Sequence, residues 1–439
     1  MTMRTLLIAA LIIHANAAAA ATFIVTEGAD LPDLNAGNGF CNVFPQPGPG
    51  PCTLRAAIIE ANALAGADTI ELQNDLADGG TFTLTRAGAG EDGAFTGDLD
   101  IIDDLTIRFF GSGERPVVDG GGLDRVFDII SGSVTLLGFD IRGGEATSDE
   151  ATSGGGVLVR STAGAVRLTL MRVHQNRAFT GGGLYNFGHD TTLSACEFDD
   201  NTFVGDINEV PSGSAIRNRG NLAIAYGSFH HNGGIPLQRP GAPAGNTSSA
   251  NTIDSEPLGA GTGSIVIANT SLVRNAGNAI NAEGAGSLEL SSTTIAGNSV
   301  RGIRLTGTGS LLMHNSIVAA NAFADCFLDD DADLDLDRYN LDSDDTCELA
   351  GGTSNRAGVD PRLTPPARHG GLTAASWPLT DSIVLDHGHP LFTATGCEND
   401  DQHLHDRPID FDGDGAALCD IGAIELDSDV IFFEPFDRL

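Results

Sequence analysis

The sequence predicts an all-β protein: a right-handed single-stranded parallel β-helix with an N-terminal capping helix and a loop-rich, disulfide-stapled C-terminal region. An apolar residue followed three positions later by Asn recurs with a period of about 23 residues. Short stretches between these units alternate polar and apolar residues, and 57 glycines accompany few aromatic residues. Short strands joined by tight turns describe one coil of such a solenoid. An antiparallel sandwich with Asn at hairpin turns is the alternative.

Residues 1–21 resemble an export signal and not a structural element. Arg4 supplies a positive charge, an apolar run follows over residues 6–13, and small residues suited to cleavage continue to Ala21. The run is shorter than the roughly 20 residues of a membrane-spanning helix, and no later stretch reaches that length. We therefore expect an exported protein, secreted or held at the cell surface, with no transmembrane helix, and we expect a monomer.

Residues 22–67 are predicted to form an N-terminal cap, because a solenoid exposes unpaired strand edges at its ends. Thr53 is suited to cap the first turn of a helix. The apolar residues that fall on one face of this helix are Leu54, Ala57, Ile58, Ala61 and Leu64. We expect that face to cover the first coil.

The repeats predict the β-helix itself over residues 68–322. Coils rise by one strand spacing, about 4.8 Å, so the apolar residue of each unit stacks on its counterpart inside. Asn tolerates left-handed backbone at a turn, and its amide can hydrogen-bond its neighbour one coil away. The recurring residues are Asn176, Asn201, Asn232, Asn275, Asn298 and Asn321.

The seven cysteines favour three disulfides, since six of them fall into close pairs in a chain predicted to be exported. Cys196 is left over in a strand-like pattern and is predicted to be a buried free thiol. The pairs are Cys41 with Cys52, Cys326 with Cys347, and Cys397 with Cys419. The last two lie in a loop-rich region predicted over residues 323–426. Residues 427–439 form an aromatic tail, either a final strand over the end of the stack or an anchoring signal.

The charge balance excludes some partners. There are 59 acidic residues against 23 basic ones, all of them arginine. A surface of this kind repels nucleic acid and anionic lipid, whereas it attracts divalent cations or basic partners. The absence of lysine excludes a lysine general base or Schiff base.

Three segments resemble exported bacterial β-helix proteins. Residues 52–62, which read Cys-Thr-Leu-Arg-Ala-Ala-Ile-Ile-Glu-Ala-Asn, resemble the family's Cys-Ser/Thr-Leu-Arg-Glu-Ala-Ile signature, with Ala56 in place of Glu. The repeats resemble the Phe-x-x-Asn and Gly-Gly-Ala-Ile units of polymorphic outer-membrane proteins. Residues 359–425 resemble the choice-of-anchor Q domain, although residues 401–404 depart from its Asp-Gln-Arg-Gly. The resemblance implies a right-handed β-helix, export and often surface attachment or adhesion. It implies no catalytic residues.

An acidic motif near the C-terminus predicts a calcium site. Asp410, Asp412 and Asp414 alternate before Gly415, and Asp420 follows. Carboxylates spaced in this way around a sharp turn suit a hard cation such as Ca²⁺. The alternative is an acidic turn held by the Cys397–Cys419 disulfide, because the twelfth position of a complete loop would be Ile421.

Aligning the repeats stacks His174, Asp199 and His230 on successive coils, with Asp200 and His231 beside them. Neighbours in such a column lie about 5 Å apart, which permits a metal or substrate site. The alternative is a solvated polar turn.

Three functions remain open. An adhesin-like module that binds carbohydrate or a cell surface is favoured, since a long stack presents extended faces and the insertions at 203–213 and 235–262 could form a contact patch. A polysaccharide lyase or glycoside hydrolase acting on acidic polysaccharide is the alternative, with Arg217 and Arg219 as candidate bases. A structural spacer is the third. No catalytic residue is assigned.

Overall fold

The computed structural model describes residues 20–427, except 46–47, 77–78, 147–151, 189, 204–212, 234–250, 257–262, 285, 337, 350–353 and 391–396. Most of the predicted signal peptide, the greater part of both insertions and nearly all of the tail therefore lie outside the described residues. Within the described part of the chain, no helix combines the length and the apolarity needed to cross a membrane.

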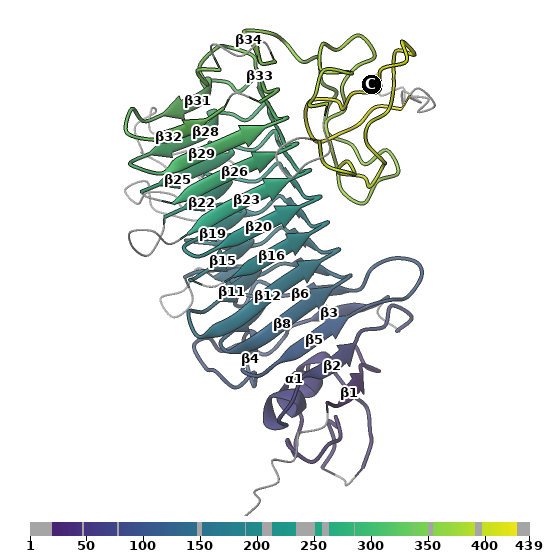
Figure 1. The fold of residues 1–439 in the computed structure, drawn as a ribbon. Coiled ribbons are helices and arrows are strands. Elements are labelled where there is room, and N and C mark those ends of the chain that lie inside the picture. The colour runs from purple at the N-terminus through teal and green to yellow at the C-terminus, as the bar shows by residue number, and fades with distance from the viewer. Residues whose placement is uncertain are drawn as a thin grey trace, which may run out of the picture.

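The fold is a right-handed parallel β-helix, and the predicted fold class is confirmed. Each complete coil contributes one strand to each of three parallel sheets, so neighbouring strands in a sheet come from successive coils, and the coils at the two ends are incomplete (Figure 1). The antiparallel alternative is wrong, because every pair of named strands is parallel, including those before Asn275, Asn298 and Asn321.

The strands are grouped here by sheet. Sheet 1 consists of β1 (Thr22–Ile24), β2 (Asp68–Glu71), β5 (Leu105–Arg108), β8 (Gly132–Leu137), β12 (Ala163–Thr169), β16 (Thr191–Ser194), β20 (Leu222–Ala225), β23 (Ser264–Ala268), β26 (Ser287–Ser291), β29 (Ser310–His314) and β32 (Asp333–Asp335). Sheet 2 consists of β3 (Thr81–Thr83), β6 (Val117–Asp119), β9 (Asp140–Arg142), β13 (Arg172–His174), β17 (Glu197–Asp199), β21 (Ser228–His230), β24 (Ser271–Val273), β27 (Thr294–Ala296), β30 (Ile317–Ala319), β33 (Leu341–Asp342) and β34 (Arg356–Ala357). Sheet 3 consists of β4 (Leu99–Ile101), β7 (Phe127–Ile129), β11 (Val157–Val159), β15 (Leu184–Asn186), β19 (Ile216–Asn218), β22 (Ile253–Ser255), β25 (Ile280–Glu283), β28 (Arg301–Thr306) and β31 (Ala324–Leu328). A short ladder between sheets 2 and 3 holds β10 (Glu145–Ala146), β14 (Arg177–Ala178) and β18 (Thr202–Phe203).

The interior is filled by columns of apolar side chains. In sheet 2 the middle residue of each strand points inward, so Val173 pairs with Phe198 and Phe198 with Phe229. The rings of Phe198 and Phe229 stack with their centroids 5.0 Å apart, and both side chains are fully buried. Cys196 is also buried and unpaired, and burial raises the pKa of its thiol to about 12. The predicted inward stacking and the free thiol are both present.

The predicted asparagines form a buried hydrogen-bonded ladder next to sheet 2. The side-chain amide of each donates to the side-chain oxygen of the next, over 2.9–3.1 Å from Asn176 to Asn321. The ladder ends where Asn321 donates to Asp325 at 2.8 Å. The expected left-handed backbone lies one residue earlier, for example at Gln175 with φ 54° and Arg274 with φ 54°. The asparagine itself points inward, and the residue before it makes the turn.

Helix α1 (Leu54–Ala63) caps the first coil, as expected. Thr53 accepts a hydrogen bond from the backbone N–H of Ala56 at 3.1 Å. Burial is not confined to one face, since Arg55 and Glu60 are as buried as the apolar residues. The N-terminal loop explains this, because Glu60 accepts backbone hydrogen bonds from Gly37 and from Gly39 on the other side of the helix.

The C-terminal region folds back along the stack instead of extending it. The coils continue past residue 322 through β34, and residues 358–427 then cross the outer face of sheet 2 without forming helices or strands where they are described (Figure 1). A second apolar core joins the two, with Ile317 and Ala319 on the sheet and Trp377, Ile421 and Ile424 in the C-terminal region. All three predicted disulfides are formed.

Candidate functional site

The outer face of sheet 2 carries two columns of side chains, one on each side of the inward-pointing column. Register places Asp140, Arg172 and Glu197 in the first column. The second column runs beside it and consists of Asp119, Arg142, His174, Asp199 and His230. Three successive coils therefore present charged or titratable groups at both positions, and the coil on either side of them presents one at the second position only. We call these eight residues the charged strip.

Opposite charges alternate within the strip. Arg172 makes a two-point contact with Asp199, at 2.8 and 2.7 Å, and lies 3.9 Å from Glu197. His230 Nε2 is 3.1 Å from a carboxylate oxygen of Glu197. The side chains of Glu197 and Asp199 are only 5 % and 3 % exposed, whereas that of Arg172 is 33 % exposed. The acids therefore form the floor of the strip, and the arginine side chain reaches the solvent.

The C-terminal region completes the strip from one end. Arg368 lies 2.8 Å from the second carboxylate oxygen of Glu197, so this acid is held between a histidine from the next coil and an arginine 171 positions later in the chain (368 minus 197). Nearby, Thr373 donates a hydrogen bond to the backbone carbonyl of Tyr226 at 3.1 Å. The C-terminal region therefore borders the strip at the coil that contains Tyr226.

The surroundings shift the pKa values of two acids in opposite directions. Burial alone would raise the pKa of Glu197, but the hydrogen bond with His230 and the charge of Arg368 outweigh it and lower that pKa to about 2. Burial raises the pKa of Asp140 to about 6, although Arg115 and Arg172 oppose the shift. The strip therefore combines a permanently ionised carboxylate with one that titrates at mildly acidic pH.

Burial also lowers the pKa of His174, and the charge of Arg172 adds to this effect. His174 Nε2 lies 4.0 Å from Asp140. The imidazole therefore adds a polar group beside the titrating acid.

The predicted column of His174, Asp199 and His230 exists in the predicted register. Asp200 and His231 both have positive φ at the turn that follows, and His231 Nδ1 lies 3.1 Å from His230 Nδ1. Sequence reasoning missed the neighbouring column with Asp140, Arg172 and Glu197. Its signal was present, because these positions lie two residues before the predicted column and so point to the same face.

The candidate bases on sheet 3 are engaged elsewhere. Arg217 pairs with Asp254 and Glu256, and Arg219 stacks over the ring of Phe187 at 5.6 Å. Neither arginine is a member of the charged strip. Their shared face is instead part of an ion-pair network on sheet 3.

The C-terminal acidic motif forms a compact turn. Oxygens of Asp410 and Asp412 lie within 4.8 Å of each other and of an oxygen of Asp386. Asp414 instead accepts the N–H of Ala416, and both oxygens of Asp420 accept backbone N–H groups, from residues 386 and 426. The set gathered at this turn therefore contains Asp386 in place of Asp414 and Asp420. Calcium binding here stays a prediction.

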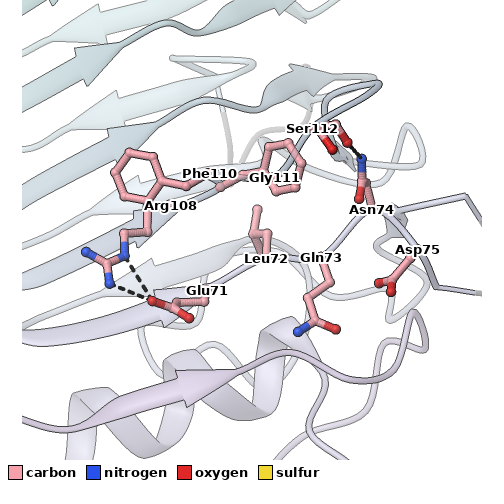
Figure 2. A pocket seen from close by; sticks show the side chains of 10 residues that line it. Glu71, Leu72, Gln73, Asn74, Asp75, Arg108, Phe110, Gly111 and Ser112 are labelled. Atoms are coloured by element: carbon pink, nitrogen blue, oxygen red, sulfur yellow. Dashed lines mark hydrogen bonds and ion pairs between the residues drawn. The ribbon is translucent and has the colours of Figure 1, made fainter.

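A separate hollow of about 420 Å³ lies between the loops that follow β2 and β5 (Figure 2). Arg108 pairs with Glu71 at 2.5 Å and lies over the ring of Phe110 at 5.2 Å. Phe110 is 71 % exposed, and Asn74 donates to the backbone carbonyls of Ser112 and of residue 114. The hollow offers an aromatic surface and amides beside the Arg108–Glu71 ion pair.

One comparison with a solved structure supports the fold. No family model matches the sequence, and no curated protein matches it. The solved structure of pectate lyase Pel9A is similar at a TM-score of 0.51 and 14 % identity, over 93 % of this chain and 98 % of that one. The A-module of the Azotobacter vinelandii mannuronan C-5 epimerase AlgE4 aligns at a TM-score of 0.25 and 13 % identity, over 69 % of this chain and 92 % of that one. The protein therefore has the parallel β-helix fold of a pectate lyase.

Proposed function

We propose that this protein binds a polysaccharide along the charged strip of sheet 2. The observation that carries the proposal is the alternation of donors and acceptors over five successive coils at the edge of the C-terminal region. Coils repeat about every 4.8 Å, so the strip presents hydrogen-bonding groups at regular intervals along a nearly flat face. An extended, hydroxyl-rich chain can use several of these groups at once.

The charges of the strip favour neutral sugars over uronates. Arg172 and Arg368 are already paired with Asp199 and Glu197, which are buried carboxylates. A uronate would have to compete with these carboxylates for the guanidinium groups, at a cost because a buried charge would lose its partner. A sugar hydroxyl can accept from the arginines and donate to the acids without separating them.

Export and attachment at the cell surface belong to the same proposal, with an adhesin-like role. Three disulfides support an oxidising compartment. The resemblance of residues 52–62 to the signature of exported β-helix proteins, the outer-membrane-type repeats and the anchor-like C-terminal region support surface attachment.

Glycoside hydrolysis is a second candidate, because the pKa values of Asp140 and Glu197 are separated. An acid with a pKa near 6 is suited to protonate a leaving group, while an ionised partner stabilises positive charge. The contacts of Glu197 with His230 and Arg368 make it a weak base, so the pair favours a stabilising role for Glu197.

The test measures retention of neutral and uronate polysaccharides by affinity electrophoresis, together with release of reducing ends. We expect saturable retention by the wild type and at least a tenfold loss in Glu197→Gln and His230→Gln. Glu283→Gln is the matched control, because this acid pairs with Arg304 on sheet 3. Product formation from a neutral polysaccharide that disappears in Asp140→Asn would establish the hydrolase, because the β-elimination of a lyase requires a uronate. Equal retention by all variants would contradict the placement of the site on the charged strip. If the wild type retained no polysaccharide at all, the result would favour a structural spacer.

A further inference from the structure

The loop between β3 and β4 covers an unusual group of acids on the outer side of sheet 3. Asp100 and Asp128 are paired in register on β4 and β7 and point away from the interior. Asp98 precedes β4, and one oxygen from each of the three acids lies within 4.8 Å of the others. All three residues are at most 3 % exposed. Carboxylates are seldom buried together without a compensating positive charge.

The nearby arginines compensate only part of this charge. Arg125 lies 2.6 Å from Asp128 and 3.5 Å from Asp98. Arg160 lies 2.8 Å from Asp128, and a fourth buried acid, Asp124, is 3.9 Å from Arg125. Four buried carboxylates against two guanidinium groups leave two negative charges, the charge of one divalent cation.

Asp100 provides an independent sign of a ligand. Its Oδ2 accepts the backbone N–H of Ala94 at 2.7 Å. Its Oδ1 is buried and has no hydrogen-bond donor among the residues that the structure describes. A buried carboxylate oxygen without a donor is costly. One oxygen from each of Asp98 and Asp128 lies within 4.8 Å of an oxygen of this acid, and a cation between the three would supply the missing partner.

The surrounding loop is held in place from the capping helix. Arg55 donates to the carbonyls of Ala94, Gly97 and Asp98, at 2.8–3.0 Å, and is paired with Asp30. Gly97 has φ 59°, and a Cβ there would lie 2.1 Å from the carbonyl oxygen of residue 88. Arg55, the arginine of the Cys-Thr-Leu-Arg motif, therefore holds one segment of the loop in place. That segment carries Asp98, and its Ala94 N–H donates the hydrogen bond to Asp100.

A second group of acids differs from the first, because hydrogen-bond donors reach both oxygens of its buried carboxylates. Oxygens of Asp325, Asp342 and Asp344 also lie within 4.8 Å of one another. There both oxygens of Asp325 accept hydrogen bonds, from Asn321 and from Ser343, and both oxygens of Asp342 accept backbone N–H groups. That cluster closes the asparagine ladder and needs no cation.

We propose that Asp98, Asp100 and Asp128 bind one Ca²⁺ ion, which locks the loop of residues 86–98 onto sheet 3. All-oxygen ligands and carboxylate charge suit a hard cation. Burial raises the pKa of Asp98 to about 9, and the neighbouring acids add to this shift while Arg125 opposes it. Bound protons are the competing way to neutralise the group.

The test compares thermal unfolding of the full chain in EDTA with unfolding in 1 mM CaCl₂ or MgCl₂. We expect Ca²⁺ to raise the Tm of the wild type, with a smaller effect of Mg²⁺. The Tm of Asp100→Asn should be higher than that of the wild type in EDTA, because repulsion between the acids is relieved. In Ca²⁺ the Tm of this variant should be lower than that of the wild type, because one ligand is lost. Equilibrium dialysis should find one fewer Ca²⁺ per chain in this variant. Glu283→Gln is the control, because this acid pairs with Arg304 on sheet 3 and belongs to no proposed metal site, and it should keep the Ca²⁺ response of the wild type.

A wild-type Tm that does not respond to Ca²⁺ would overturn the proposal in favour of protonated acids. A response that survives in Asp100→Asn but disappears in Asp412→Asn would move the ion to the exposed turn. Hydrogen exchange of the wild type provides a readout that does not depend on a folded variant. Ca²⁺ should slow exchange of the amides of residues 94–100, and unchanged exchange there would also refute the site.

Discussion

The two halves of the outer face of sheet 2 have the same backbone and opposite surfaces. From β6 to β21 the outward positions carry the charged strip. From β24 onward the same two columns carry Ser271, Thr294 and Ile317 beside Val273, Ala296 and Ala319. Inside the coil the two halves are alike, since both have apolar columns and the asparagine ladder. The outward residues alone decide which half stays open and which half is covered.

The covered half shows what small and apolar side chains permit. Ser271 donates to Gln402 at 2.6 Å, Thr294 accepts the N–H of Ala423 at 2.9 Å, and Ile317 enters the second apolar core. Short side chains let the C-terminal region approach the sheet closely. Charged side chains cannot be covered in this way without losing their hydration, so the covering region ends where the strip begins, with Arg368 facing Glu197.

The largest expected loss of stability comes from a substitution in the covered half, where the C-terminal region packs on sheet 2. Trp377 is 1 % exposed in the second apolar core. Trp377→Ala should cost about 3–5 kcal/mol, because a large buried side chain is replaced by a cavity. Chemical denaturation and limited proteolysis should show the C-terminal region opening first. Leu379→Ala, at a partly exposed position, is the control, and equal cleavage in both variants would contradict the docking role.

Removing one asparagine of the ladder should destabilise the protein equally in the two halves. Asn201→Ala removes the acceptor of Asn176 and the donor to the carbonyl of Val173, and Asn298→Ala does the same to Asn275 and Leu272. Each should cost about 2–4 kcal/mol, because buried groups lose their partners. Urea denaturation measures both. A loss confined to one half would show that the halves also differ inside.

The open half should respond to pH between about 4 and 6 through Asp140. The pKa of Asp140 is raised to about 6 in the folded protein, so its protonated form favours folding at low pH. This contribution is lost as pH rises through 6 and amounts to at most about 3 kcal/mol. The difference in unfolding free energy between the wild type and Asp140→Asn should therefore fall from pH 4 to pH 7. A flat difference would contradict the burial of this acid.

The smallest expected loss of stability comes from the end of the charged strip that lies nearest the N-terminus. Arg142 pairs with Asp119 at 2.8 Å, but its side chain is 38 % exposed. Arg142→Ala should cost no more than about 1 kcal/mol, because solvent screens exposed ion pairs. Differential scanning calorimetry at low and high salt would detect a larger loss. Such a loss would mean that the whole strip, and not only its buried acids, stabilises the sheet.

Much of the fold and part of the site could be predicted because the chain repeats. Asn275, Asn298 and Asn321 are 23 residues apart and in contact, so a period in the sequence becomes a ladder in space. The same alignment found the column of His174, Asp199 and His230. It missed Arg368, because this residue belongs to no repeat and nothing in its local sequence points toward Glu197.

The sequence by itself determined the coil, its interior columns, the capping helix and the three disulfides, because each depends on residues related by a short, regular spacing. Only the tertiary structure decided that residues 358–427 turn back over sheet 2, that Arg368 completes the charged strip, and that the loop of residues 86–98 encloses Asp100. These contacts join segments with no common period. They depend on which surfaces fit when the chain is folded, and that fit is a property of shape and charge in three dimensions.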